Sequence, residues 1–212
     1  MTGKISVALI DDDGDVLDAL ASFLERRGVL VTSFPASRPF LNAIEAGRRF
    51  DCIVSDVRMP EISGLELQRL LKGIPYPMPL VLITGHGDID MAVSALKAGA
   101  ADFIEKPTDD ERLLESIKSA VSRSREILDE EAELASLRQR YEQLSERQRE
   151  VMGLAIKGLS NKEIAALLGI SPRTVEHYRE WAMERMQARN FAELVRMAAE
   201  LKLTARAKAS DR

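Results

Sequence analysis

The 212-residue chain has the composition of an ordinary globular protein, with enough material for two modest domains. Hydrophobic residues make up 45% and charged residues 30%, which excludes global disorder. No window approaches the roughly 18 consecutive apolar residues of a membrane span, and the N-terminus lacks a signal-peptide pattern. We therefore expect a cytoplasmic protein with no membrane partner.

The net charge of −4 is distributed unevenly along the chain. Residues 1–144 are acidic, whereas residues 145–212 contain 13 basic and 9 acidic residues. Only this last segment has a charge suited to nucleic acid.

The first 125 residues alternate short β-branched runs with amphipathic segments, as βα units around a parallel sheet do. We predict an α/β, flavodoxin-like (βα)5 domain over residues 1–122 with the sheet order 2-1-3-4-5. Thr108 and Glu111 have the spacing of a capping box for its last helix. The predicted strands are 5–10, 29–34, 52–55, 80–84 and 102–105, and the predicted helices lie around 16–24, 40–45, 64–72, 89–97 and from 109 onward.

Residues 123–143 are predicted to form a helical linker, because no Pro or Gly interrupts them. Two interpretations of their apolar residues remain open. A short dimeric coiled coil would use a heptad seam that Glu130 interrupts. Alternatively, the linker is a solvated helix whose few leucines pack on the flanking domains. The seam residues are Ile127, Leu134, Leu137, Tyr141 and Leu144.

Residues 144–203 are predicted to form an all-α domain of four helices, followed by a polar tail over residues 204–212. Capping boxes or related pairs mark the helix starts: Ser145 with Gln148, Ser160 with Glu163, Ser171 before Pro172, and Asn190 with Glu193. The short helix over 161–168 turns at Gly169 into a longer one over 172–188. That arrangement is typical of a helix-turn-helix.

Carboxylates gather where two of the predicted strands end. Asp11, Asp12 and Asp13 follow the first strand, and Asp56 follows the third. Ligands bind at this edge of an open α/β sheet, and crowded carboxylates persist when a hard cation lies among them. We predict a Mg2+ site here, although Asp13 is explained better as the N-cap of the next helix.

Thr84 and Lys106 end the fourth and fifth strands and add a hydroxyl and a cation to the same edge. A carboxylate can become an acyl phosphate if cations neutralise the phosphoryl oxygens. Asp56 is the natural nucleophile, since it stands alone at the end of a central strand.

Four segments resemble the motifs of receiver domains, most closely those of FixJ-type regulators: residues 10–12, 55–60, 83–88 and 102–107. The resemblance implies a phosphoryl group delivered to Asp56 by a sensor histidine kinase, and a cis Lys106–Pro107 bond. It implies partner contact or switching, rather than catalysis, for the loop containing His86. The implied roles are direct Mg2+ ligation by Asp12, Asp56 and the Arg58 carbonyl, Mg2+ ligation through water by Asp11, phosphoryl contact by Lys106, and a switch formed by Thr84 and Phe103.

Residues 144–203 resemble the LuxR-type DNA-binding domain, which implies that the helix from Pro172 enters the major groove of double-stranded DNA. Trp181 is interpreted as a packing residue. Tyr178 stands where the family usually has His, and His177 lies one position earlier, so the base preference is open. The exposed face of that helix is expected to carry Arg173, Glu176, His177, Glu180 and Glu184, and of these all but Glu184, a plain surface residue, are expected base readers. The expected phosphate contacts are Lys162, Arg173, Thr174 and Arg179, with a plain solvated lysine as the alternative for Lys162.

These features predict a response regulator transcription factor, not an enzyme, that forms a homodimer on phosphorylation. The first alternative is an aspartate-nucleophile phosphatase-like enzyme, which would need a second Asp two residues after the nucleophile. Val57 and Arg58 follow Asp56 instead. The second alternative is an RNA-binding or protein-binding output, against which the helix-turn-helix spacing argues.

Overall fold

The computed structural model describes residues 3–74, 78–85, 89–106 and 110–203. The chain divides into two compact units between Ile127 and Leu128, and each is described by itself. The predictions for His86, the Lys106–Pro107 bond, the Thr108 capping box and the tail over residues 204–212 lie outside the described residues.

The N-terminal unit contains a five-stranded parallel sheet in the order β2-β1-β3-β4-β5, which confirms the predicted topology. The strands are β1 (Ser6–Ile10), β2 (Leu30–Phe34), β3 (Cys52–Asp56), β4 (Leu80–Thr84) and β5 (Asp102–Glu105). Asp56 is the last residue of β3 rather than the first residue after it. Every residue of β3 and β4 is buried, as expected for central strands with both faces covered.

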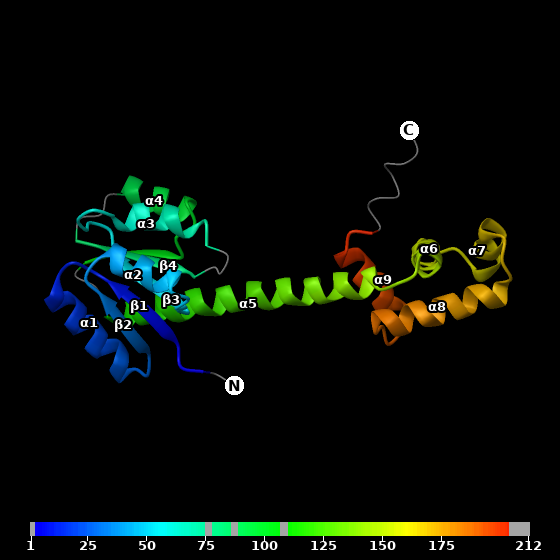
Figure 1. Cartoon of the computed structure of the whole chain (residues 1–212), viewed down its shortest axis with the longest axis horizontal. Coiled ribbons are helices and arrows are strands. Elements are labelled where there is room, and N and C mark those ends of the chain that lie inside the picture. The colour runs from blue at the N-terminus through cyan, green and yellow to red at the C-terminus, as the bar shows by residue number, and fades with distance from the viewer. Residues whose placement is uncertain (1–2, 75–77, 86–88, 107–109, 204–212) are drawn as a thin grey trace. The chain divides into compact units, whose positions relative to one another are not determined.

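Helices cover both faces of this sheet (Figure 1). The first face packs against α1 (Gly14–Arg26) and the N-terminal part of α5 (Asp110–Glu142), and the second against α2 (Ser37–Glu45), α3 (Gly64–Leu71) and α4 (Ile89–Lys97). Two separate apolar clusters result, one on each side of the sheet. The sheet edge at the carboxyl ends of the strands is left for polar side chains.

The C-terminal unit contains the four predicted helices: α6 (Glu146–Ala155), α7 (Asn161–Leu168), α8 (Pro172–Met186) and α9 (Phe191–Glu200). Reciprocal capping boxes at Ser145 and Ser160 are confirmed. Asn190 caps α9 as predicted, but Glu193 does not reciprocate. Its carboxylate accepts hydrogen bonds from the backbone and guanidinium of Arg189 instead.

The last turns of α5 belong to the core of the C-terminal unit. Leu137 is only 2% exposed and packs in one cluster with Leu144, Met152 and Met186, while Tyr141 lies against the same cluster. The arrangement differs from the coiled-coil alternative, because it buries seam side chains that a second helix would have to contact. Among the helices of the described ranges, none has the length and hydropathy needed to cross a membrane.

Candidate functional site

The carboxyl ends of the parallel strands bring four polar residues to one edge of the sheet. Asp11 follows β1, Asp56 ends β3, Thr84 ends β4 and Lys106 follows β5. The strand register fixes these positions, since Ile10 pairs with Ser55 and Asp56 pairs with Ile83. We call these four residues the acidic edge. The sequence predicted these four residues at this edge, together with Asp12.

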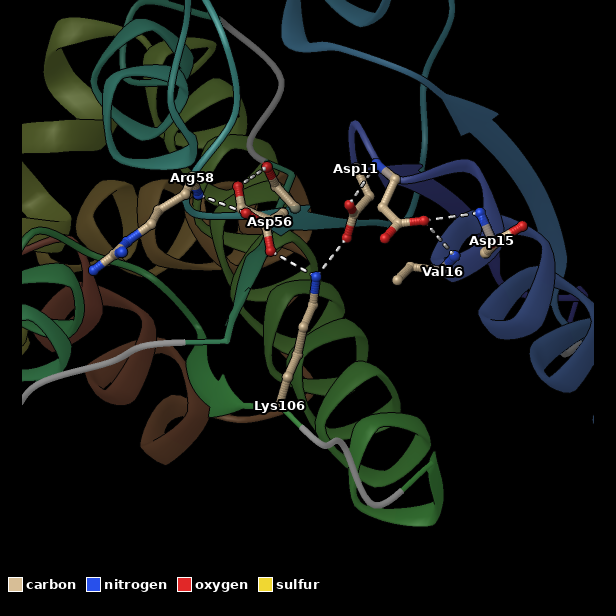
Figure 2. Close-up of polar contacts among 8 residues, drawn as sticks. Asp11, Asp15, Val16, Asp56, Arg58 and Lys106 are labelled. Carbon is tan, nitrogen blue, oxygen red and sulfur yellow. Dashed lines mark hydrogen bonds and ion pairs between the residues drawn. The ribbon is translucent and has the colours of Figure 1, made fainter.

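An ion pair network holds the acidic edge together. The Nζ of Lys106 lies 2.7 Å from an oxygen of Asp11 and 2.7 Å from an oxygen of Asp56, and Figure 2 shows this ammonium between the two carboxylates. Both carboxylates are almost completely buried. Partial burial alone would lower the pKa of Lys106, but its hydrogen bonds to Asp11 and Asp56 and their charges raise that pKa. Lys106 is therefore a fixed positive charge between two acids.

Asp12 and Asp13 lie outside this network. The carboxylate of Asp13 accepts hydrogen bonds from the backbone of Asp15 and Val16, so Asp13 is the N-cap of α1 as predicted. Asp12 is exposed. Among the described residues, no three Asp, Glu, His or Cys side chains converge as a metal-ligand group. The oxygen donors that converge are those of Asp11 and Asp56, which fits a hard cation held by two carboxylates and completed by water.

Backbone packing fixes the orientation of Asp56. The backbone N–H of Arg58 donates a hydrogen bond to the Oδ2 of Asp56, with 2.5 Å between nitrogen and oxygen (Figure 2). Gly64, the first residue of α3, lies so close that a Cβ there would come within 2.3 Å of the Asp56 carbonyl oxygen. Ser63 and Glu66 form a capping box that starts α3 at this point, a signal which the sequence analysis missed.

The predicted switch residues have different environments. Thr84 is completely buried at the end of β4, and its backbone carbonyl accepts a hydrogen bond from the backbone of Lys106. Phe103 lies in β5 and packs, partly buried, against the apolar cluster beneath α2, α3 and α4. The structure therefore places Thr84 at the acidic edge and Phe103 on the adjoining apolar layer.

The second candidate site is α8, which has one buried and one exposed face. Val175, Ala182 and Met186 form the buried face. The expected base readers Arg173, Glu176, His177 and Glu180 are exposed together with Glu184, as predicted from helical periodicity. We call these five residues the outer face of α8.

The expected phosphate contacts divide into exposed and internally bonded residues. Lys162 and Arg173 are exposed, while the Thr174 hydroxyl lies 2.8 Å from the Ser171 hydroxyl. Arg179 has internal partners: its guanidinium donates to the Asn161 side chain at 2.7 Å and lies 4.7 Å from the centre of the Phe191 ring. Arg179, which belongs to α8, therefore links this helix to α7 and α9 through contacts within the C-terminal unit.

Trp181 also differs from its predicted environment. It was interpreted as a packing residue, yet its side chain is 49% exposed beside the outer face of α8. Periodicity alone could not resolve this, because position 181 falls at the border between the two faces of the helix.

Comparisons with known proteins agree with both units. Residues 7–118 match the response regulator receiver domain, and residues 142–198 match the bacterial regulatory proteins of the luxR family. The chain is 45% identical over 198 residues to the transcriptional regulatory protein FixJ of Bradyrhizobium diazoefficiens, covering 93% of this chain and 96% of FixJ.

Two solved structures extend the match over both units. Response regulator StyR aligns with a TM-score of 0.81 and 37% identity, covering 93% of this chain and all of StyR. Full-length FixJ from B. japonicum aligns with a TM-score of 0.60 and 44% identity, covering 95% of this chain and 99% of FixJ. The chain therefore belongs to the two-component response regulators, transcriptional regulators that join an aspartate-phosphorylated receiver domain to a LuxR-type DNA-binding domain.

Proposed function

We propose that Asp56 is the aspartate that accepts the phosphoryl group from a sensor histidine kinase. The observation that carries this proposal is the Lys106 ammonium held 2.7 Å from both Asp11 and Asp56 at the sheet edge. In the reaction, an Asp56 oxygen attacks phosphorus, a P–O bond forms, and the P–N bond to the kinase histidine breaks. The departing imidazole nitrogen keeps the bonding electron pair.

The other residues of the acidic edge would then stabilise the product. Lys106 exchanges its contact with Asp56 for one with a phosphoryl oxygen, and the Thr84 hydroxyl donates to another. Phe103, which packs on the apolar layer beside β5, would change its packing as Thr84 moves and so carry the change to the unit's surface.

Mg2+ is the cofactor that we propose for this edge. Asp11 and Asp56 present the buried carboxylates, with Asp12 and the Arg58 carbonyl as further candidate ligands. When bound, the ion would offset negative charge on the phosphoryl oxygens.

The phosphoacceptor assignment can be tested with acetyl phosphate and Mg2+, using the mass of the intact protein as the readout. We expect one added phosphoryl group on the wild type and on Asp18→Asn, a control at an exposed position of α1. We expect none on Asp56→Asn. Labelling of Asp56→Asn, or wild-type labelling that EDTA leaves unchanged, would contradict the assignment.

We propose further that the outer face of α8 reads base pairs, with Lys162 and Arg173 contacting phosphates. A carboxylate such as Glu176 or Glu180 can accept a hydrogen bond from the amino group of cytosine. Thr174 is a candidate phosphate contact from the first turn of α8. We expect Glu176→Ala and His177→Ala to change preference at particular base pairs, measured on specific and scrambled duplexes. Equal losses on both duplexes would argue against base reading by α8.

A homodimer formed on phosphorylation is also proposed. Ile89, Val93 and Leu96 are exposed apolar residues at helical spacing on α4, beside β5. In this dimer, a second copy of the chain covers the apolar stripe on α4. Because the dimer acts on chromosomal DNA, we place the protein in the cytoplasm. We expect sedimentation equilibrium to show more dimer after phosphorylation, and Val93→Glu to abolish that increase. An unchanged monomer fraction would exclude this proposal.

A further inference from the structure

The chain contains a single tryptophan, and its side chain is half exposed on α8. Tryptophan is usually buried over most of its large apolar surface. Exposure of one apolar residue needs no explanation by itself. The surroundings of Trp181 are what distinguish it from the other exposed apolar residues.

Two aromatic neighbours fix the orientation of the indole. The ring of His177 stacks on it with centroids 6.1 Å apart and an interplanar angle of 26°. Tyr178 meets it edge to face, with centroids 5.6 Å apart and an angle of 80°. Both rings restrict the rotamers open to the indole, which lowers the side-chain entropy that binding against it would cost.

The position of Trp181 on α8 extends the outer face. His177 lies one turn before it, and Glu184 lies three residues after it on the same side. The buried residues Val175, Ala182 and Met186 form the other face of the helix, and Trp181 stands at the border between the two faces. A base pair that contacts His177 would lie next to the indole, because the two rings are stacked.

The chemistry of the indole selects one partner group in the major groove. The groups around it on the outer face are charged or polar, while the indole offers an apolar edge and a single N–H donor. Base edges in the major groove present polar donors and acceptors, with one apolar exception, the C5-methyl group of thymine. The indole is uncharged, so it lacks the attraction that Lys and Arg side chains have for a phosphate.

We propose that Trp181 is a specificity-determining residue that packs against a thymine methyl group in the DNA site. This inference rests on the proposed function of α8 in base reading. His177 serves as the platform that holds the indole, while the charged residues of the outer face supply the polar contacts.

Intrinsic fluorescence gives a direct test, since Trp181 is the only tryptophan. The full-length protein, treated with acetyl phosphate and Mg2+, is titrated with a duplex selected from a random pool. Acrylamide quenching of Trp181 is measured together with the anisotropy of the labelled duplex. We expect binding to protect the indole from acrylamide. Binding by anisotropy with unchanged quenching would overturn the inference, whereas no binding to any duplex would count against the proposed function instead.

Replacement of thymine by deoxyuridine tests the methyl contact itself. Removing each thymine methyl of the selected duplex in turn should weaken wild-type binding about four-fold at one position of each half-site, corresponding to about 0.8 kcal/mol for one buried carbon group. Trp181→Ala should bind the thymine and deoxyuridine duplexes equally, while Trp181→Phe should retain part of the preference.

Leu167→Ala is the matched control, because Leu167 is an exposed apolar residue of the same unit on α7. It should keep the full preference for thymine. Thermal unfolding of each variant separates loss of contact from loss of fold. An equal preference for thymine in the wild type and Trp181→Ala would overturn the inference.

Discussion

The acidic edge and the outer face of α8 both consist mostly of charged side chains, but they differ in burial and in the contacts that hold those side chains in place. Asp11 and Asp56 are 1% and 6% exposed and are bonded through Lys106 across several strands. Arg173, Glu176 and Glu180 are exposed on one helix. Sheet register and close backbone packing therefore fix the acidic edge. The outer face of α8 can change without disturbing the fold, as long as its buried face is kept.

The largest effect should come from the core beneath α8. Leu137→Ala removes a side chain that is 2% exposed in the cluster containing Ala182 and Met186. We expect the free energy of unfolding of the C-terminal unit to fall by about 2–5 kcal/mol. Urea unfolding followed by Trp181 fluorescence measures it. Leu134→Ala, at a partly exposed position, should cost much less, and a loss that depends on protein concentration would favour the coiled-coil seam instead.

A smaller loss of stability is expected when an added side-chain atom crowds the backbone at the acidic edge. Gly64→Ala places a Cβ within 2.3 Å of the Asp56 carbonyl oxygen, a backbone atom that cannot move cheaply. Overpacking of this kind costs about 1–3 kcal/mol. Gly14→Ala is the control, because Gly14 also begins a helix but has open space around it. Equal stability of the two variants in urea would show that α3 can shift away from Asp56.

Arg179 and Arg173 should respond in opposite ways. Arg179→Met removes an internal charged hydrogen bond and an aromatic contact, so it should lower stability by about 1–2 kcal/mol while leaving the salt dependence of DNA binding unchanged. Arg173→Ala should leave stability unchanged and reduce the salt slope by about one unit, since one phosphate contact is lost. A reduced slope for Arg179→Met would restore Arg179 as a phosphate contact.

The smallest effect on stability is expected on the outer face itself. Glu180 is exposed, and its oxygen lies 3.6 Å from the nearer ring nitrogen of His177. Exposed ion pairs contribute little to stability, so Glu180→Gln should change the free energy of unfolding by less than about 0.5 kcal/mol. Base preference should nevertheless change, as measured by selection from a random duplex pool. If Glu180→Gln lowered the free energy of unfolding by more than about 1 kcal/mol, the outer face of α8 could not change without disturbing the fold, and it would not differ from the acidic edge in this respect.

The architecture and the membership of the acidic edge could be predicted from the sequence, because both follow from periodicity. Alternating strands and helices indicate a parallel sheet, and the order 2-1-3-4-5 is that of the flavodoxin-like class to which five such units are assigned. Parallel strands then bring Asp56, Thr84 and Lys106 to one edge whatever the details of packing. The buried and exposed faces of α8 followed from its period of 3.6 residues.

The pairing of long side chains could not be predicted in this way. Arg179 has a periodicity compatible with either a phosphate or an internal partner, and only the three-dimensional structure identifies Asn161 and Phe191 as internal partners. The heptad spacing of Leu137 is likewise compatible with a second helix or with the unit's own core. Periodicity specifies which side a residue faces, but not what lies opposite.

The helix starts of the C-terminal unit have a consequence for folding kinetics. Ser145, Ser160, Ser171 and Asn190 each cap a helix through a bond to a residue three positions ahead. These boundaries can form before any distant contact exists. The N-terminal sheet instead needs encounters such as Ser6 with Asp51, 45 residues apart. Because non-local pairing slows folding, the C-terminal unit should fold within microseconds to milliseconds, and the sheet should form after it.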